Sequence, residues 1–170
     1  RLQKLSQEFL KESARAKYSY NFNNLGRPII QYPEDIVTMQ ELIWATRPDL
    51  IIETGIAHGG SLVMSSSMLA ILDVCDAVEK GEKIDPSRSS RLVIGIDIDI
   101  RDHNRKAIEN LPKSSRIKML SGSSIEPKII EKVRDLAKIY RRILACLDSN
   151  HSHEHVLAEL EAYAPLTTVG

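Results

Sequence analysis

Residues 50–61, Leu-Ile-Ile-Glu-Thr-Gly-Ile-Ala-His-Gly-Gly-Ser, decide the fold of this 170-residue chain. A short apolar run ends in an acid and a glycine-rich turn, and a helical pattern follows directly over residues 60–80. Glycine lets the backbone turn sharply, and the amino terminus of the following helix offers backbone N–H groups to a ligand. The stretch therefore predicts a buried strand, a ligand-binding turn and a helix.

Three further apolar runs, at 91–97, 117–120 and 143–148, extend this pattern along the chain. Helical patterns separate them at 101–110 and 126–139. Strands that are apolar on both faces and alternate with helices are typical of a parallel sheet between two helix layers. We predict an α/β fold, a doubly wound, mostly parallel sheet with helices on both faces.

The amino-terminal part of the chain shows a different pattern. Residues 1–16 place apolar side chains at helical spacing, which predicts an amphipathic helix that covers another surface. Aromatic, Asn, Gly and Pro residues after Tyr18 predict an ordered loop, either a packed connector or a substrate lid. We divide the single domain into a helical or lid region, 1–47, and a cofactor-binding core, 48–170. The sequence stops where another strand is expected, so we expect the carboxyl-terminal strands of the fold to be missing from this chain.

Composition limits the classes of partner. The chain has 23 Lys and Arg against 23 Asp and Glu, so no overall field favours nucleic acid or an anionic membrane. No segment reads as a membrane span or a signal peptide, and we expect a cytoplasmic protein. Cys75 and Cys146 lack CxxC spacing, which favours simple packing over zinc or a disulfide.

Polar residues interrupt the apolar runs where the first three strands end. In open parallel sheets, ligands bind outside these carboxyl ends. Glu53 would sit badly beside pyrophosphate and favours a cationic or hydroxyl-rich ligand, and neither GxGxxG nor GxxxxGK[ST] is present. Asp97 either takes both hydroxyls of a ribose or belongs to an alternating Asp-Ile-Asp edge strand. Ser123 and Ser124 either border an adenine ring or form a plain turn.

The fourth run ends in Asp148-Ser-Asn-His-Ser-His-Glu-His, which gathers three of the five histidines. His151 and His155 are four apart and could share a helical face, but zinc needs further ligands that this stretch does not clearly supply. Magnesium prefers carboxylate oxygen, which indicates Asp148. We expect His153 and His155 to be exposed residues of a helix start.

Four ordered motifs resemble the cephalosporin hydroxylase and rhamnosyl O-methyltransferase group of class I methyltransferases. They lie at residues 25–33, 52–61, 95–101 and 147–157. The resemblance implies a Rossmann-like fold that binds S-adenosylmethionine, with Asp97 on its ribose and Ser123 and Ser124 near its base. It also implies that the first turn holds the methionine part through Glu53, Gly55, Ala57, Gly59 and Ser61.

The same resemblance implies an O-methyltransferase assisted by magnesium. Asp148 matches the first of three metal ligands in catechol-type relatives, and the other two are expected beyond the end of this sequence. His151 takes the place of the lysine that removes the acceptor's proton, and histidine can accept a proton near neutral pH. The acceptor is then a hydroxyl of a sugar or glycolipid, or of a secondary metabolite.

Three other functions remain open from the sequence. An iron-dependent hydroxylase would use Asp148, His151 and His153 as a facial triad. A non-catalytic cofactor-fold module and an NAD(P)-dependent oxidoreductase are the remaining alternatives. The amphipathic first helix and the unfinished sheet edge also predict a homo-oligomer.

Overall fold

The computed structural model describes residues 1–86, 88–112 and 114–168. Short 3-10 turns lie at Tyr18–Asn21, Ser114–Arg116 and Ala164–Leu166. The strands are β1 (Phe22–Asn24), β2 (Arg27–Ile29), β3 (Leu50–Thr54), β4 (Leu92–Asp97), β5 (Ile117–Ser121) and β6 (Ile143–Leu147). The helices are α1 (Leu2–Arg15), α2 (Pro33–Thr46), α3 (Gly60–Lys80), α4 (Asp102–Glu109), α5 (Pro127–Ala137) and α6 (His153–Tyr163).

Four strands form one parallel sheet in the order β5-β4-β3-β6. The chain runs outward from β3 through β4 to β5 and then returns to β6 on the other side of β3. This reversal of strand order creates a crevice at the carboxyl ends of β3 and β6, where ligands of such sheets bind. The α/β prediction is confirmed, and the four predicted strands lie within a residue or two of the observed ones.

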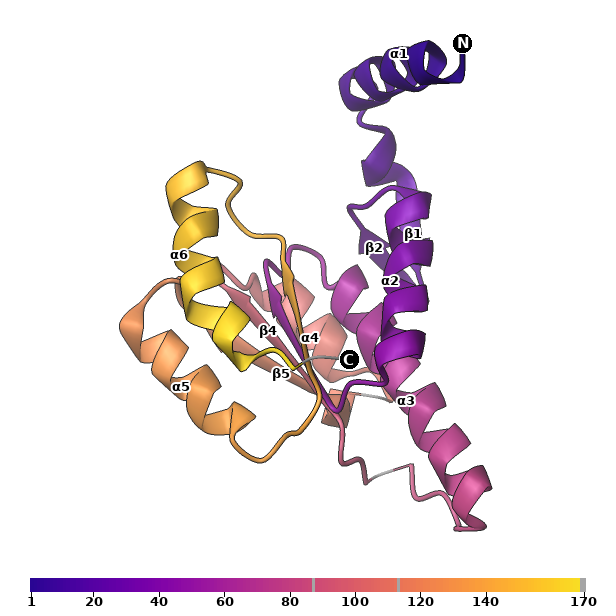
Figure 1. Cartoon of the computed structure of the whole chain (residues 1–170), viewed down its shortest axis with the longest axis vertical. Helices are drawn as coiled ribbons and strands as arrows, with labels where there is room; N and C mark the ends of the chain where they lie inside the picture. The colour runs from indigo at the N-terminus through magenta and orange to yellow at the C-terminus, as the bar shows by residue number, and fades with distance from the viewer. Residues whose placement is uncertain (87, 113, 169–170) are drawn as a thin grey trace.

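Helices cover both faces of the sheet because side chains alternate along each strand. Ile51 and Val93 belong to a core cluster with residues of α2, α3 and α4. Ile52 and Ile94 belong to the opposite cluster, with residues of α5 and α6. The two helix layers lie on opposite sides of the sheet in Figure 1. The doubly wound arrangement is therefore confirmed; the division at residues 47 and 48 stays a prediction.

The predicted loop after Tyr18 is in fact mostly a hairpin. Strands β1 and β2 pair antiparallel, and Leu25 and Gly26 between them have φ of 46° and 85°. Two successive positive φ values indicate a type I′ turn, which matches the twist of paired strands. The hairpin packs on α3: a Cβ on Gly60 would lie 2.4 Å from the carbonyl oxygen of Pro28.

Helix α1 lies at one end of the molecule, away from the sheet (Figure 1). Its apolar side chains are exposed, Leu2 by 82% and Leu10 by 54%. Its far end is attached where the Ser13 hydroxyl bonds the Tyr32 hydroxyl at 2.9 Å. These side chains stay largely uncovered within the described chain, and the expectation that the helix covers another surface stays a prediction.

Helix α3 is long and apolar enough to span a membrane by length and composition, a property that the sequence analysis missed. About half of the qualifying stretch is buried inside the fold. Its buried residues include Leu62, Leu69 and Leu72, which pack in the core cluster between the sheet and α2. The apolar side chains of α3 thus pack in the core of the fold.

A buried ion-pair cluster closes the other end of the sheet, where β4 begins. Arg91 is 4% exposed and binds Asp73 at 2.5 Å and Asp76 at 2.6 Å. Arg116 binds the second oxygen of Asp73 at 3.0 Å, and Arg47 binds Asp76. These contacts join α3 to β4 and to the segment before β5. The sequence analysis did not anticipate them, because the partners are far apart along the chain.

Replacing Asp73 with alanine is expected to lower the free energy of unfolding by about 3–5 kcal/mol, because Arg91 and Arg116 would stay buried without this partner. Urea denaturation measures this change. Asp135→Ala is the matched control, since Asp135 pairs with Lys138 at an exposed position and such pairs contribute about 1 kcal/mol or less. An equal, small effect of both substitutions would contradict the structural role of the cluster.

Candidate active site

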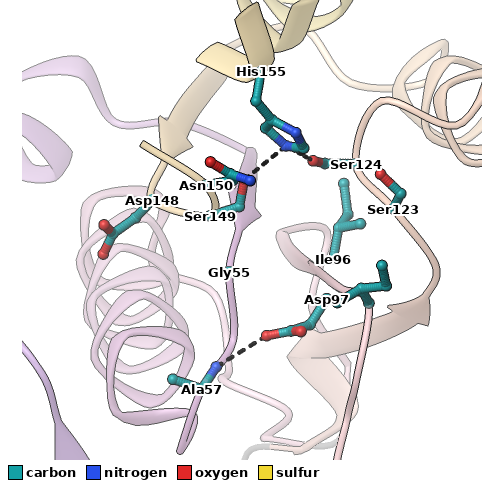
Figure 2. Close-up of a pocket in the computed structure, with 11 residues that line it drawn as sticks. Gly55, Ala57, Ile96, Asp97, Ser123, Ser124, Asp148, Ser149, Asn150 and His155 are labelled. Carbon is teal, nitrogen blue, oxygen red and sulfur yellow. Dashed lines mark hydrogen bonds between the residues drawn. The ribbon is translucent and has the colours of Figure 1, made fainter. Parts of the chain in front are cut away.

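A cavity of about 290 Å³ opens at the carboxyl edge of the sheet. Small-molecule sites usually measure roughly 300–1,000 Å³, so the cavity suits one compact group. Every strand of the sheet contributes to it, as the sequence predicted (Figure 2). Its lining consists of Gly55, Ala57, Ile96, Asp97, Ile98, Ser123, Ser124, Asp148, Ser149, Asn150 and His155.

Asp97, the last residue of β4, holds the turn that follows β3. Its Oδ2 accepts hydrogen bonds from the backbone N–H groups of Ile56, at 2.8 Å, and Ala57, at 3.2 Å. Its Oδ1 accepts the N–H of Asp99 at 3.0 Å. These two amides of the turn are therefore satisfied within the chain, whereas the expectation that the amino terminus of α3 offers N–H groups to a ligand stays a prediction. A carboxylate has about four acceptor positions and three are taken here, so Asp97 can still accept one hydroxyl group from the cavity side.

Two side chains missed by the sequence analysis fix the carbonyl groups of the same turn. Arg27 of β2 donates to the carbonyl oxygen of His58 at 2.6 and 3.0 Å. Asn104 of α4 is buried and donates to the carbonyl of Ala57 at 3.0 Å, while its own oxygen accepts from Arg27. The turn is thus held in advance by β2, β4 and α4.

Glycine is required where this turn meets the end of β6. Gly55 has φ of 88°, and a Cβ there would lie 2.1 Å from the carbonyl oxygen of Asp148. Gly59 has φ of 83°, and its Cβ would meet Ile108 at 2.4 Å. Glycine adopts such positive φ values readily, whereas other residues do so at a cost. The predicted ligand-binding turn therefore has the backbone that its sequence indicates.

Glu53 is 2% exposed and is not part of the cavity wall. It lies in β3 and accepts a hydrogen bond from the hydroxyl of Ser65 on α3. Burial raises the pKa of Glu53 to about 7, although hydrogen bonds from Ser65 and Ser61 oppose the shift. Its predicted contact with a cofactor stays a prediction. The structure places a buried carboxyl group between β3 and α3, where it is hydrogen-bonded to Ser65.

The raised pKa of Glu53 predicts a pH-dependent stability. The folded state holds the proton more tightly than the unfolded state, so stability is full below about pH 4.5 and falls as the pH rises through about 7. Glu53→Gln is expected to remove this loss, which amounts to about 3 kcal/mol. Denaturation at pH 4.5 and pH 8 measures it, with the exposed Glu41→Gln as control. Parallel pH profiles of wild type and Glu53→Gln would contradict the assignment.

A buried polar cluster forms the wall opposite Asp97 in Figure 2. His155 Nε2 lies 3.0 Å from the hydroxyl of Ser124 and 3.2 Å from that of Ser149. Glu159, 1% exposed, accepts the hydroxyl of Ser149 at 2.6 Å and lies 3.4 Å from His155 Nε2. Tyr163 donates to the backbone carbonyl of Ser124 at 2.6 Å. The expectation that His155 is exposed is therefore wrong: its side chain is 16% exposed.

Asp148 and His151 come together at the rim. His151 Nε2 lies 3.5 Å from Asp148 Oδ1, and the imidazole is 79% exposed and outside the cavity wall. Burial raises the pKa of Asp148, while His151 and a hydrogen bond from Gln31 oppose that shift. Asp148 also borders a narrow neighbouring pocket of about 40 Å³, where Ser61 lies. His153 is exposed, as expected.

The described residues contain no group of three His, Cys, Asp or Glu side chains that could hold a metal ion. Asp148 and His151 provide one carboxylate and one imidazole, whereas an iron facial triad needs two histidines and a carboxylate. His153 is not part of such a group. The donor set seen here therefore fits neither a complete magnesium site nor an iron site, and no chemical step can be derived through a metal.

Comparison with known proteins finds matches over most of the chain. The family model described as Rhamnosyl O-methyltransferase/CmcI matches residues 16–170. Rhamnosyl O-methyltransferases of Mycobacterium tuberculosis and Mycobacterium leprae are 29% and 27% identical over 140 and 147 residues, which are 80% and 86% of this chain. These stretches are 48% and 56% of the two enzymes, so the chain spans about half the length of the curated relatives that it matches.

Solved structures share the fold at low identity. A TDP-rhamnose 3′-O-methyltransferase of calicheamicin biosynthesis gives a TM-score of 0.58 at 16% identity and covers 79% of this chain and 58% of its own. A Bacillus cereus O-methyltransferase in complex with SAH gives 0.58 at 15% identity, over 96% and 61%. A CmcI structure described as Mg-SAM gives 0.54 at 16% identity, over 85% and 53%.

Proposed function

Because the chain belongs to the rhamnosyl O-methyltransferase/CmcI family, we propose that it is the cofactor-binding part of an enzyme that methylates a hydroxyl group, with S-adenosylmethionine as the methyl donor. The observation that carries the proposal is the cavity beside Asp97. It lies outside the carboxyl ends of the strands, beside the reversal of strand order, where such folds bind nucleotides.

The cavity wall suits a nucleoside. Asp97 can accept a ribose hydroxyl, and Ile98, which follows it, is 76% exposed and offers apolar surface to a planar base. On the far side, Ser124 and His155 provide polar groups for the edge of that base. Gly55 and Ala57 lead from the cavity into the neighbouring narrow pocket, where Ser61 lies. We assign the methionine part of the donor to this narrow pocket.

The donor supplies an electrophilic methyl group on a sulfonium, which needs only a well-placed nucleophile. The turn held by Asp97, Asn104 and Arg27 would bind the donor without rearrangement, so positioning provides much of the rate. We assign to His151 the task of accepting the proton of the acceptor hydroxyl. Asp148, 3.5 Å away, would orient the imidazole and stabilise its charged form.

The acceptor is proposed to be a sugar hydroxyl, on a glycolipid or on a glycosylated metabolite. Support comes from the relatives, because the mycobacterial enzymes are rhamnosyl O-methyltransferases and the calicheamicin enzyme acts on TDP-rhamnose. Magnesium assistance is part of the same proposal: one CmcI structure is described with Mg and SAM, and Asp148 is the residue here that suits the ion. The described residues hold no group of three His, Cys, Asp or Glu side chains for this ion, so its further ligands stay a prediction.

A methyl-transfer assay tests this function. The protein is incubated with methyl-labelled S-adenosylmethionine and a panel of rhamnosides and nucleotide-linked rhamnoses, and products are identified by mass spectrometry. Transfer to a sugar oxygen supports the proposal. Binding of the donor without transfer to any hydroxyl acceptor would favour the non-catalytic module.

A further inference from the structure

We propose that His155 makes the cavity selective for adenine, by fixing the hydroxyl of Ser124 as a hydrogen-bond donor, and that Glu159 positions His155 for this task. The inference rests on the proposed function, since it specifies how the same cavity recognises its nucleoside. The sequence predicts His155 as an exposed residue of a helix start, whereas the structure places it in the cavity wall.

The histidine ring joins two loops across the cavity wall. It starts from the first turn of α6 and reaches Ser124, after β5, and Ser149, after β6. Figure 2 shows both contacts converging on one ring nitrogen, Nε2. The position of the Ser124 hydroxyl therefore depends on His155, while its backbone is held separately by Tyr163.

The direction of the hydrogen bonds follows from counting protons. The hydroxyl of Ser149 donates its single proton to Glu159 Oε1 at 2.6 Å, so toward His155 it can only accept. Glu159 Oε1, also an acceptor, lies 3.4 Å from the same Nε2. Two acceptors around Nε2 favour the tautomer with a proton on that nitrogen. Because Nε2 then carries a proton, it cannot accept one from Ser124, which leaves the hydroxyl proton of Ser124 for another acceptor at the cavity wall.

The burial of Glu159 supports a role toward a ligand. Its carboxylate is 1% exposed, and Oε2 has no hydrogen-bond partner among the residues that the structure describes. Buried polar atoms are nearly always paired, and exceptions call for an explanation. A carboxylate that served only to stabilise the fold would be expected to have hydrogen-bond partners on both oxygens, and Oε2 of Glu159 has none among the described residues. Its contacts with Ser149 and His155 are better explained by the orientation that they impose on the cavity wall.

The geometry selects one edge of the base. With the ribose at Asp97, the edge farthest from the sugar, N1 and the 6-amino group, points toward the opposite wall, where Ser124 and His155 lie. Adenine N1 is an acceptor and matches a donating Ser124. Hypoxanthine carries a proton at N1, so a fixed donor would meet a donor. The cavity should therefore discriminate between adenine and hypoxanthine cofactors.

The test compares calorimetric titrations of SAH and its 6-oxo analogue, S-inosylhomocysteine. Wild-type protein is expected to bind SAH more tightly by about 10- to 100-fold, the effect of one mismatched, buried hydrogen bond. His155→Ala and Ser124→Ala are each expected to reduce this preference to about 3-fold or less, mainly by weakening SAH binding. Glu159→Gln should reduce it partially. His103→Ala, at an exposed position of α4, is the matched control and should keep the full preference.

The outcomes separate the inference from the function on which it rests. If wild-type protein binds neither ligand, the proposed function fails. If it binds both ligands equally well, or if His155→Ala and Ser124→Ala weaken both ligands by the same factor, the function stands and the selectivity of His155 is overturned. Ser124→Ala removes a single oxygen, so its result remains decisive even if His155→Ala fails to fold.

Discussion

Replacing Asp97 with alanine is expected to weaken SAH binding by at least about 100-fold. The substitution removes the acceptor of a ribose hydroxyl, and a hydrogen bond to a charged group contributes about 1.5–3 kcal/mol. It also removes the acceptor of the Ile56 and Ala57 amides, so the turn itself is expected to loosen. Calorimetric titration of SAH into wild type and variant measures the change.

Two further variants separate these effects. Asp97→Asn keeps one carbonyl oxygen for the turn and is expected to fold normally, with an affinity between those of wild type and Asp97→Ala. Asp99→Ala is the matched control, because Asp99 is a carboxylate two residues later whose side chain is 77% exposed and outside the cavity wall. Wild-type affinity in Asp97→Ala would contradict the ribose site.

Replacing His151 with alanine is expected to lower kcat by about 10²- to 10⁴-fold, the usual contribution of a general base. The affinity for S-adenosylmethionine should stay unchanged, because the imidazole lies outside the cavity wall. Steady-state assays of methyl transfer measure the change in kcat, and titration of the donor measures the change in its affinity. The result would assign His151 to the chemical step.

His151→Lys tests the role by rescue, since an amine three residues after the aspartate is expected to restore part of the activity at higher pH. His153→Ala is the control, because His153 is exposed and makes no described contact with Asp148. Full activity in His151→Ala would contradict the assignment, and equal losses in His151→Ala and His153→Ala would point to disruption of α6.

The sequence predicts the sheet well because each strand carries its own signal. Residues such as Ile51 and Ile52 face opposite helix layers, so the whole run is apolar and reads as a buried parallel strand. The hairpin gives a weaker signal. Leu25 adopts positive φ in its turn, a conformation for which glycine or asparagine is the usual marker, so the sequence predicts a loop in place of the two three-residue strands beside it.

The site is predictable where it follows from the strand ends and unpredictable where it depends on packing between distant segments. Gly55, Asp97, Ser124 and Asp148 come together because the carboxyl ends of parallel strands share one edge. The sequence analysis predicts His155 as an exposed residue of a helix start and leaves open that it shares a helical face with His151. The helix begins only at His153, so that spacing argument does not apply, and His155 turns inward to Ser124.

Arg27 and Asn104 show the same limit. Each contacts the turn after β3 from a segment more than 25 residues away in the sequence, Arg27 from the hairpin and Asn104 from α4. No local pattern marks a side chain that will hydrogen-bond a distant carbonyl. Such contacts follow only once the hairpin and α4 are docked beside the turn.

Calorimetric titration of SAH into the wild-type protein tests the central claim most directly. The account predicts saturable binding of one SAH per chain, with competition by S-adenosylmethionine at the same site. Folded protein that binds neither compound would contradict the claim that the cavity beside Asp97 is a cofactor site.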